Sequence, residues 1–147
     1  MKALAIIALG VAATASSCSV MAQGLSLQLH GISLHTESRD KYDRTGRDWN
    51  ERNYGGGLRY TFNPDWSVQA GVYRNSIDRT TVYGLATYTP LHIGPVRVGV
   101  FGGLATGYNA PVIGGVALEL GPVTIRVVPK IKGATPLVFG VEVGIPF

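Results

Sequence analysis

The chain has a single cysteine, Cys18, and this residue lies inside an N-terminal segment with the features of a leader peptide. Met1 and Lys2 precede an apolar run at residues 3–13, and small residues follow as far as Ala22. This order of charged, apolar and small residues predicts a secretory signal peptide over residues 1–22. Cleavage after Ala22 would remove Cys18, so no disulfide is expected in residues 23–147. The alternative is a lipoprotein signal cleaved before Cys18, although residues 15–17 lack the leucine usually found there.

The chain also lacks a strong excess of either sign of charge, with 13 Lys and Arg residues against 9 Asp and Glu residues. Such an even mixture argues against binding to nucleic acid. An uncharged run at residues 98–118 is long enough for a membrane-spanning helix, but it contains six glycines and Pro111. Inside a helix these cost roughly 1 and 3 kcal/mol each. Two strands joined by a turn are therefore the better prediction for this run.

The usual signatures of metal and nucleotide sites are missing. The three histidines, His30, His35 and His92, have no metal-ligand spacing, and we expect packing or surface roles for His30 and His92. The glycines of residues 99–107 are not followed by the Lys-Ser/Thr pair of a phosphate-binding loop. No metal and no cofactor are therefore predicted.

What the sequence does contain is alternation with a period of two. At the C-terminus, large apolar residues at 139, 141, 143, 145 and 147 alternate with residues that are mostly small or charged. Similar patterns predict strands at residues 25–34, 57–62, 66–73, 81–89, 96–101, 115–120, 123–128 and 138–147, with a phase slip near Gly31. Turns are expected at residues 63–65, 90–95 and 121–122.

Eight such strands favour an all-β fold, an eight-stranded antiparallel transmembrane barrel of the outer-membrane type. Residues 23–147 would form this single domain. The alternative is a secreted soluble barrel or sandwich, but the faces predicted to point outward carry almost no charge. Charged residues on the inward faces are expected to pair with one another in the lumen. These are Arg59, Arg97, Glu119, Arg126 and Glu142.

The main polar segment lies at residues 36–52, where acidic and basic side chains are mixed. It is predicted to be one long extracellular loop, and loops on rigid scaffolds often carry function. His35 begins the loop. Strand parity places Asn75 and Ser76 at the same rim, where a serine and a histidine could form a nucleophile and base pair. A solvated histidine and an ordinary Asn-Ser turn are the structural alternatives.

Several of these residues also form a wider pattern. His35, the segment WNERNYGGG at residues 49–57, YRNS at residues 73–76 and GPVTI at residues 121–125 follow one another in order. In order and spacing the chain resembles the outer-membrane lipid A palmitoyltransferase family, PagP. The resemblance implies an eight-stranded barrel that moves a palmitoyl chain from a phospholipid to a hydroxyacyl chain of lipid A, without a cofactor.

The resemblance assigns roles to individual residues. His35 would be the general base, while Asn75 and Ser76 would orient the attacking hydroxyl or stabilise the oxyanion. Tyr73 is expected to contact the substrate, and basic loop residues could bind lipid phosphates. These are Arg39, Lys41, Arg44, Arg47 and Arg52. A solvated loop is the alternative for this basic set.

Prolines at two strand ends add to the resemblance. Pro111 and Pro129 flank the hairpin that turns at residues 121–122, and neither has an N–H to donate. The ladder should weaken there, and the family is thought to admit lipid laterally at such gaps. Simple strand ends would explain these prolines equally well.

The chain also departs from the family. Asn75 stands where the family has Asp, and His30 and Asn53 stand where it has a second pair of prolines. No amphipathic helix fits before Leu25, and the acyl chain length is left open. Two alternatives therefore remain beside the acyltransferase: a non-catalytic barrel with a surface-binding loop, and a lipid A deacylase. A monomer in the bacterial outer membrane is expected in each case.

Overall fold

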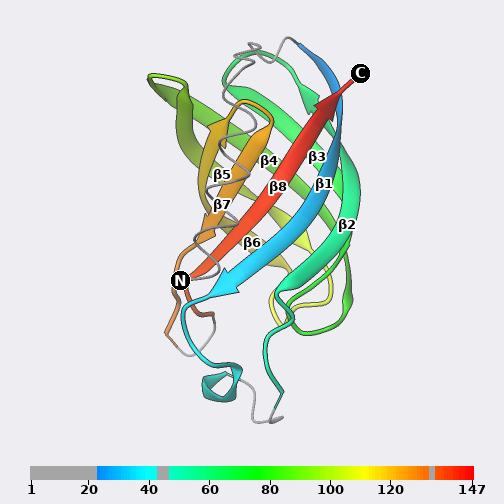
Figure 1. Cartoon of the computed structure of the whole chain (residues 1–147), viewed down its shortest axis with the longest axis vertical. Helices are drawn as coiled ribbons and strands as arrows, with labels where there is room; N and C mark the ends of the chain where they lie inside the picture. The colour runs from blue at the N-terminus through cyan, green and yellow to red at the C-terminus, as the bar shows by residue number, and fades with distance from the viewer. Residues whose placement is uncertain (1–22, 43–46, 133–134) are drawn as a thin grey trace.

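A computed structural model of the chain describes residues 23–42, 47–132 and 135–147. Eight antiparallel strands pair in sequence order and close into a barrel (Figure 1). The strands are β1 (Gly24–His35), β2 (Arg52–Thr61), β3 (Trp66–Arg74), β4 (Thr80–Ile93), β5 (Val96–Ala105), β6 (Val112–Leu120), β7 (Val123–Val128) and β8 (Val138–Pro146). The predicted all-β, eight-stranded fold is confirmed. The predicted signal peptide at residues 1–22, with Cys18, lies outside the described residues.

Helical structure plays little part in the described ranges. It is limited to one short 3-10 helix, η1 (Arg39–Lys41), in the segment that follows β1. No helix in these ranges is long and apolar enough to cross a membrane.

The barrel has two ends that differ in their connections (Figure 1). We call the end that carries Gly24, Pro146 and the short turns after β2, β4 and β6 the terminal end. The opposite end, which we call the loop end, carries the segment between β1 and β2 and the connection between β3 and β4. Because β1 and β3 run in the same direction, both strands finish at the loop end.

Side-chain alternation explains which residues face the lumen. On β3 and β4 every second residue is buried over much of the strand, while the residues between them are exposed. In β1 the register of both neighbouring ladders shifts just after His30, around Gly31, where the sequence predicted a phase slip. Such a bulge inserts one residue and reverses the facing of those that follow. It therefore allows both His30 and Ser33 to face inward.

One predicted turn is wrong in its extent. The sequence predicted a turn over residues 90–95, but β4 continues to Ile93 and the chain reverses at Gly94 and Pro95. Pro90 is accommodated because the register between β4 and β5 shifts between Tyr88 and Leu91. A proline can lie within a strand at such an irregularity because it does not have to donate to the ladder there.

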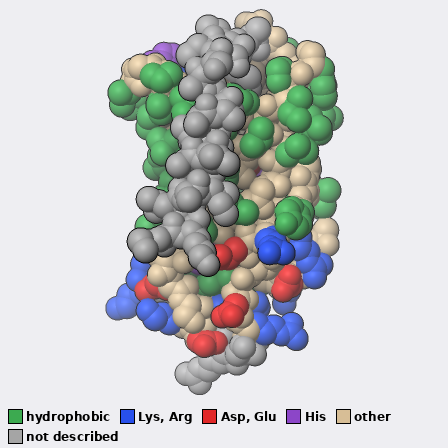
Figure 2. Space-filling model, in the orientation of Figure 1, with side chains coloured by type: hydrophobic (Ala, Val, Ile, Leu, Met, Phe, Trp, Pro, Cys, Tyr) green, Lys and Arg blue, Asp and Glu red, His purple; other side chains and the backbone are tan. Residues whose placement is uncertain are grey.

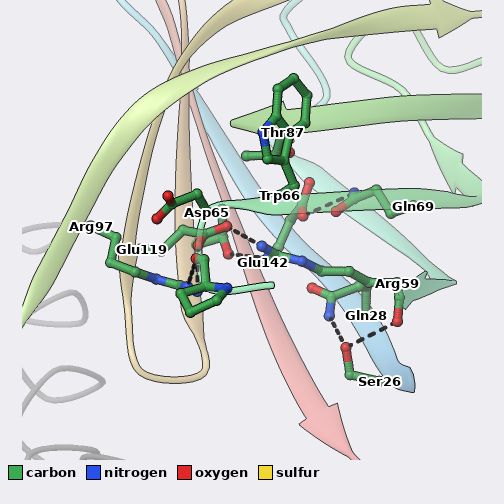
Figure 3. Close-up of polar contacts among 12 residues, drawn as sticks. Ser26, Gln28, Arg59, Asp65, Trp66, Gln69, Thr87, Arg97, Glu119 and Glu142 are labelled. Carbon is green, nitrogen blue, oxygen red and sulfur yellow. Dashed lines mark hydrogen bonds and ion pairs between the residues drawn. The ribbon is translucent and has the colours of Figure 1, made fainter. Parts of the chain in front are cut away.

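The half of the lumen toward the terminal end is filled by ion pairs (Figure 3). The Glu119 carboxylate accepts hydrogen bonds from Arg59 and from Arg97, the latter at 2.7 Å. Deeper in the barrel, Arg126 Nε donates to Glu142 Oε1 at 2.9 Å. All five charged residues predicted to pair inside the barrel do so.

The outer wall is apolar over much of its height. Exposed valine, leucine and isoleucine side chains lie on most of the strands. Aromatic pairs gather toward the terminal end, where Trp66 stacks on Tyr88 and Tyr60 packs edge-on against Phe62. On the face in Figure 2, charged side chains gather at the lower end of the molecule, which is the loop end, and apolar side chains lie at both sides of the wall above them.

Candidate functional site

His35 ends β1 at the loop end, and the following segment folds back over it. The His35 ring stacks on the Trp49 indole, with 4.5 Å between ring centroids and 11° between planes. Trp49 is held in turn, because its Nε1 donates to the Glu37 carbonyl at 2.7 Å. His35 Nδ1 is buried and has no hydrogen-bond partner among the described residues. In the neutral ring this nitrogen would be available to accept or donate a proton.

Glu37 fastens the same segment to the segment that follows β7, two strands away around the barrel. Its carboxylate accepts hydrogen bonds from Lys41 at 3.1 Å, from Lys130 at 2.9 Å and from the Tyr42 hydroxyl. The hydrogen bond from Tyr42, followed by those from Lys130 and Lys41, lowers the pKa of Glu37 to about 2. Since Lys130 follows β7, this carboxylate ties together the segments after β1 and after β7.

Asn75 follows β3 at the same end and is completely buried. Its Nδ2 donates to Thr81 Oγ1 at 3.0 Å and to the Gly107 carbonyl at 3.2 Å. Its Oδ1 accepts the backbone N–H groups of Ile77 at 3.1 Å and Arg79 at 2.8 Å. Both donors and both acceptor positions of the amide are therefore used to shape the connection between β3 and β4, and none is left for a substrate.

Ser76 has different surroundings. Its Oγ lies 3.4 Å from Ser33 Oγ, and its backbone carbonyl accepts the N–H of Asn50 at 2.9 Å. The structure thus brings His35 and Ser76 to the same end of the barrel. In the described part of the chain no hydrogen bond joins His35 to Asn75 or to Ser76.

A cavity of about 100 Å³ lies in the lumen on the loop side of the ion pairs. Ser76 and Tyr73 line it, but His35 and Asn75 do not. Most of the lining is apolar, from Leu85 and Phe101 among others, and Arg126 and Glu142 lie at its inner limit. The barrel is therefore hollow near the loop end and packed with paired charges toward the terminal end.

Three tyrosines and a histidine supply further polar groups to the cavity lining. The Tyr73 hydroxyl lies 2.8 Å from that of Tyr108, and the Tyr83 hydroxyl lies 2.7 Å from His30 Nε2. His30 Nδ1 lies 3.5 Å from Glu142 Oε1. The prediction of a packing role for His30 agrees with these contacts. Among the described residues no group of His, Cys, Asp and Glu could hold a metal ion.

The basic residues predicted to bind phosphate differ in exposure. Arg47 and Arg52 are exposed at the loop end, whereas Arg39 is buried with Nη1 3.3 Å from the Asp48 carbonyl and its guanidinium 5.8 Å from the centre of the Trp49 ring. Arg44 lies outside the described residues. Only part of the predicted basic set is thus placed where a ligand could reach it.

The ladder between β6 and β7 is short at the loop end. Pairing runs from Val116 with Val127 to Leu120 with Val123, so residues 112–115 of β6 have no partner in β7. Pro111 and Pro129 flank this unpaired stretch, as their missing N–H groups predicted. Ile113 and Val128, which lie beside the gap, also line the cavity.

Sequence reasoning missed two polar residues of the cavity wall, Ser33 and Asn53. The facing of Ser33 depends on the bulge near Gly31, and Asn53 lies between the predicted loop and the strand predicted at residues 57–62. A comparison of the chain with protein-family models and with curated proteins found no match.

Proposed function

We propose that this chain is an outer-membrane acyltransferase that moves a fatty acyl chain from a phospholipid to lipid A. The observation that carries the proposal is the apolar cavity, which lies near the loop end, where His35, Ser76 and exposed basic residues also lie. At about 100 Å³ the cavity can take only part of a hydrocarbon chain, with the ester near polar groups at the mouth.

The outer surface supports a place in the membrane. Apolar side chains cover the wall, and a group of aromatic residues lies toward the terminal end. Outer-membrane barrels have this combination of an apolar band with aromatic girdles at its edges. The loop end would then face outward, where Arg47 and Arg52 can bind the phosphates of lipopolysaccharide. The signal peptide predicted at residues 1–22 would direct the chain out of the cytoplasm.

The chemistry needs a base and a polar group at the cavity mouth. His35 takes the proton of the lipid A hydroxyl as the oxygen attacks the carbonyl carbon of the phospholipid ester. The new ester bond forms, the old C–O bond breaks, and His35 returns the proton to the departing lysophospholipid. Ser76 donates a hydrogen bond to the oxyanion. Asn75, whose amide is fully used, instead holds the turn that follows Ser76.

For this reaction Trp49 has to move. Its ring covers His35, and neither residue borders the cavity. The unpaired stretch between β6 and β7, bounded by Pro111 and Pro129, offers a lateral route for the donor chain into the cavity.

The test uses purified protein, a phospholipid with a labelled acyl chain, and lipid A. Labelled lipid A should form with the wild-type protein, and His35→Ala and Ser76→Ala should each lower the rate. Two matched controls, His92→Ala and Ser67→Ala, change the same residue types elsewhere in the barrel and should retain activity. A fully active His35→Ala variant would exclude the mechanism.

A non-catalytic barrel is the second candidate. The full use of the Asn75 amide and the cover of Trp49 over His35 favour it. Complete absence of labelled product from a folded wild-type protein would support this role. Loss of an acyl chain from lipid A would instead indicate a lipid A deacylase.

A further inference from the structure

Asn53 lines the cavity and carries a hydrogen-bond acceptor that no described residue uses. Its side chain is 7% exposed, and Nδ2 donates to the Arg74 carbonyl at 3.0 Å and to the Asn50 carbonyl at 3.4 Å. Oδ1 is buried and receives no hydrogen bond from the described residues. Two backbone carbonyls can only accept, so the amide cannot be rotated to exchange its oxygen and nitrogen. The free group is therefore an oxygen that can only accept.

This oxygen belongs to a polar strip on one wall of the cavity. Ser33 and Ser76, which are 5% and 7% exposed, line the same cavity as Asn53, and their hydroxyl oxygens are 3.4 Å apart. The three residues come from β1, from β2 and from the residues just after β3, so they occupy neighbouring positions around the barrel. Across the lumen the lining includes Phe101 and Ile113. The cavity thus has one polar wall and one apolar wall.

A buried polar group without a partner costs free energy, and a ligand that supplies the missing hydrogen bond removes that cost. We propose that Asn53, Ser33 and Ser76 form a subsite for the hydrogen-bond donor of an acyl amphiphile, a hydroxyl or an amide N–H next to its hydrocarbon chain. Because Oδ1 of Asn53 is buried, the side chain has to shift slightly to accept from this donor, while the two serine hydroxyls can bind a neighbouring carbonyl. The hydrocarbon lies against the apolar wall.

Because Asn53 Oδ1 can only accept a hydrogen bond, it distinguishes between the two lipids of the proposed reaction. A phospholipid ester has only acceptor oxygens at its carbonyl group, so it cannot satisfy Asn53. A hydroxyacyl chain carries an O–H and fits. This assignment rests on the proposed function and deepens it, because it places the acceptor lipid, rather than the donor lipid, on the wall formed by β1, β2 and β3.

Binding can be tested without any acyl transfer. The folded protein in phosphocholine micelles is titrated with dodecanamide, which has N–H donors, and with methyl dodecanoate, which has none. Binding is followed by NMR at the backbone amides of Ser33, Asn53 and Ser76. The ratio of the two affinities is compared between variants, so that partition of each probe into the micelle cancels. One hydrogen bond corresponds to roughly 3- to 10-fold in affinity.

The expected result is that Asn53→Leu reduces the preference for the amide by this factor. Asn109→Leu is the matched control, because Asn109 is an exposed asparagine that does not line the cavity, and it should leave the ratio unchanged. If Asn53→Leu fails to fold, Asn53→Ala removes the same acceptor and should also reduce the preference. An unchanged ratio in folded Asn53→Leu, or in folded Asn53→Ala, would overturn the subsite.

The outcome is separate from that of the enzyme assay. Dodecanamide does not have to react, so a protein that transfers no acyl chain can still show the preference. In that case the subsite stands and the acyltransferase proposal falls. If the protein transfers acyl chains but shows no preference for the amide, the subsite falls and the acyltransferase proposal stands.

Discussion

The buried pair of Arg126 and Glu142 gives the sharpest prediction about stability. Both side chains are 6% exposed, and Arg126 also donates to Gln69 Oε1 at 2.7 Å and to Thr87 Oγ1 at 3.2 Å. Arg126→Met leaves the Glu142 carboxylate in the lumen with Gln69 as its remaining strong partner, through a hydrogen bond of 3.2 Å. Removing one member of a buried pair costs about 3–5 kcal/mol. Because Gln69 still compensates in part, we expect a loss at the lower end of this range, about 3 kcal/mol.

The double variant separates pairing from packing. Glu142→Leu alone should also cost about 3 kcal/mol, because it leaves the Arg126 guanidinium buried. With both charges replaced by apolar groups, the remaining cost is that of the Gln69 amide, which loses its partners Arg126 and Glu142, roughly 1–3 kcal/mol. The double variant should therefore lose far less than the sum of the single losses.

The measurement is the free energy of unfolding from urea titrations of the protein in lipid vesicles, with folded and unfolded barrels separated by gel migration. Ser67→Ala is the control for a change of a buried side chain away from this pair. Additive losses in the double variant would refute the reasoning, because they would mean that the two charges do not depend on each other.

Three further predictions concern the wall and the loop. Gly57→Ala should cost roughly 1–3 kcal/mol, because its Cβ would lie 2.5 Å from a carbonyl oxygen and from a tyrosine hydroxyl, whereas Gly84→Ala has open space and should be neutral in the same urea titrations. Val100→Arg, on the apolar wall, should cost about 2–4 kcal/mol in vesicles, against about 0–1 for Thr80→Arg at the loop end; equal costs would argue against a membrane around β5. The pKa of Glu37 is lowered from 4.5 to about 2, so its stabilisation of the loop is present above pH 4.5 and lost as the pH falls toward 2. Protease cleavage of the loop should therefore increase as the pH falls from 4.5 toward 2. The Glu37→Gln variant should be cleaved readily at every pH tested.

The barrel itself could be predicted because each strand has to separate an apolar outer wall from a filled lumen. Alternation in the sequence therefore located all eight strands, and the inward facing of Arg59 and Glu119 followed from it. The end of β4 could not be located, because Pro90 usually marks a turn and here coincides with a shift of register. Whether a proline ends a strand depends on the neighbouring strand, which the local sequence does not specify.

The candidate site was predictable only in part. Strand direction correctly placed His35 and Ser76 at one end of the barrel. The use of the Asn75 amide depends on contacts with Thr81 and Gly107, and these arise only when β4 and the segment after β5 come together. The position of Asn53 in the cavity wall likewise depends on the closure of the barrel. Such contacts between distant segments leave no local signal in the sequence.

The most direct test of the central claim is mass spectrometry of lipid A from cells that do and do not produce the protein. The account predicts lipid A species heavier by one acyl chain in cells with the wild-type protein, and their absence with His35→Ala produced at the same level. Unchanged lipid A in cells whose outer membrane contains the folded wild-type barrel would contradict it.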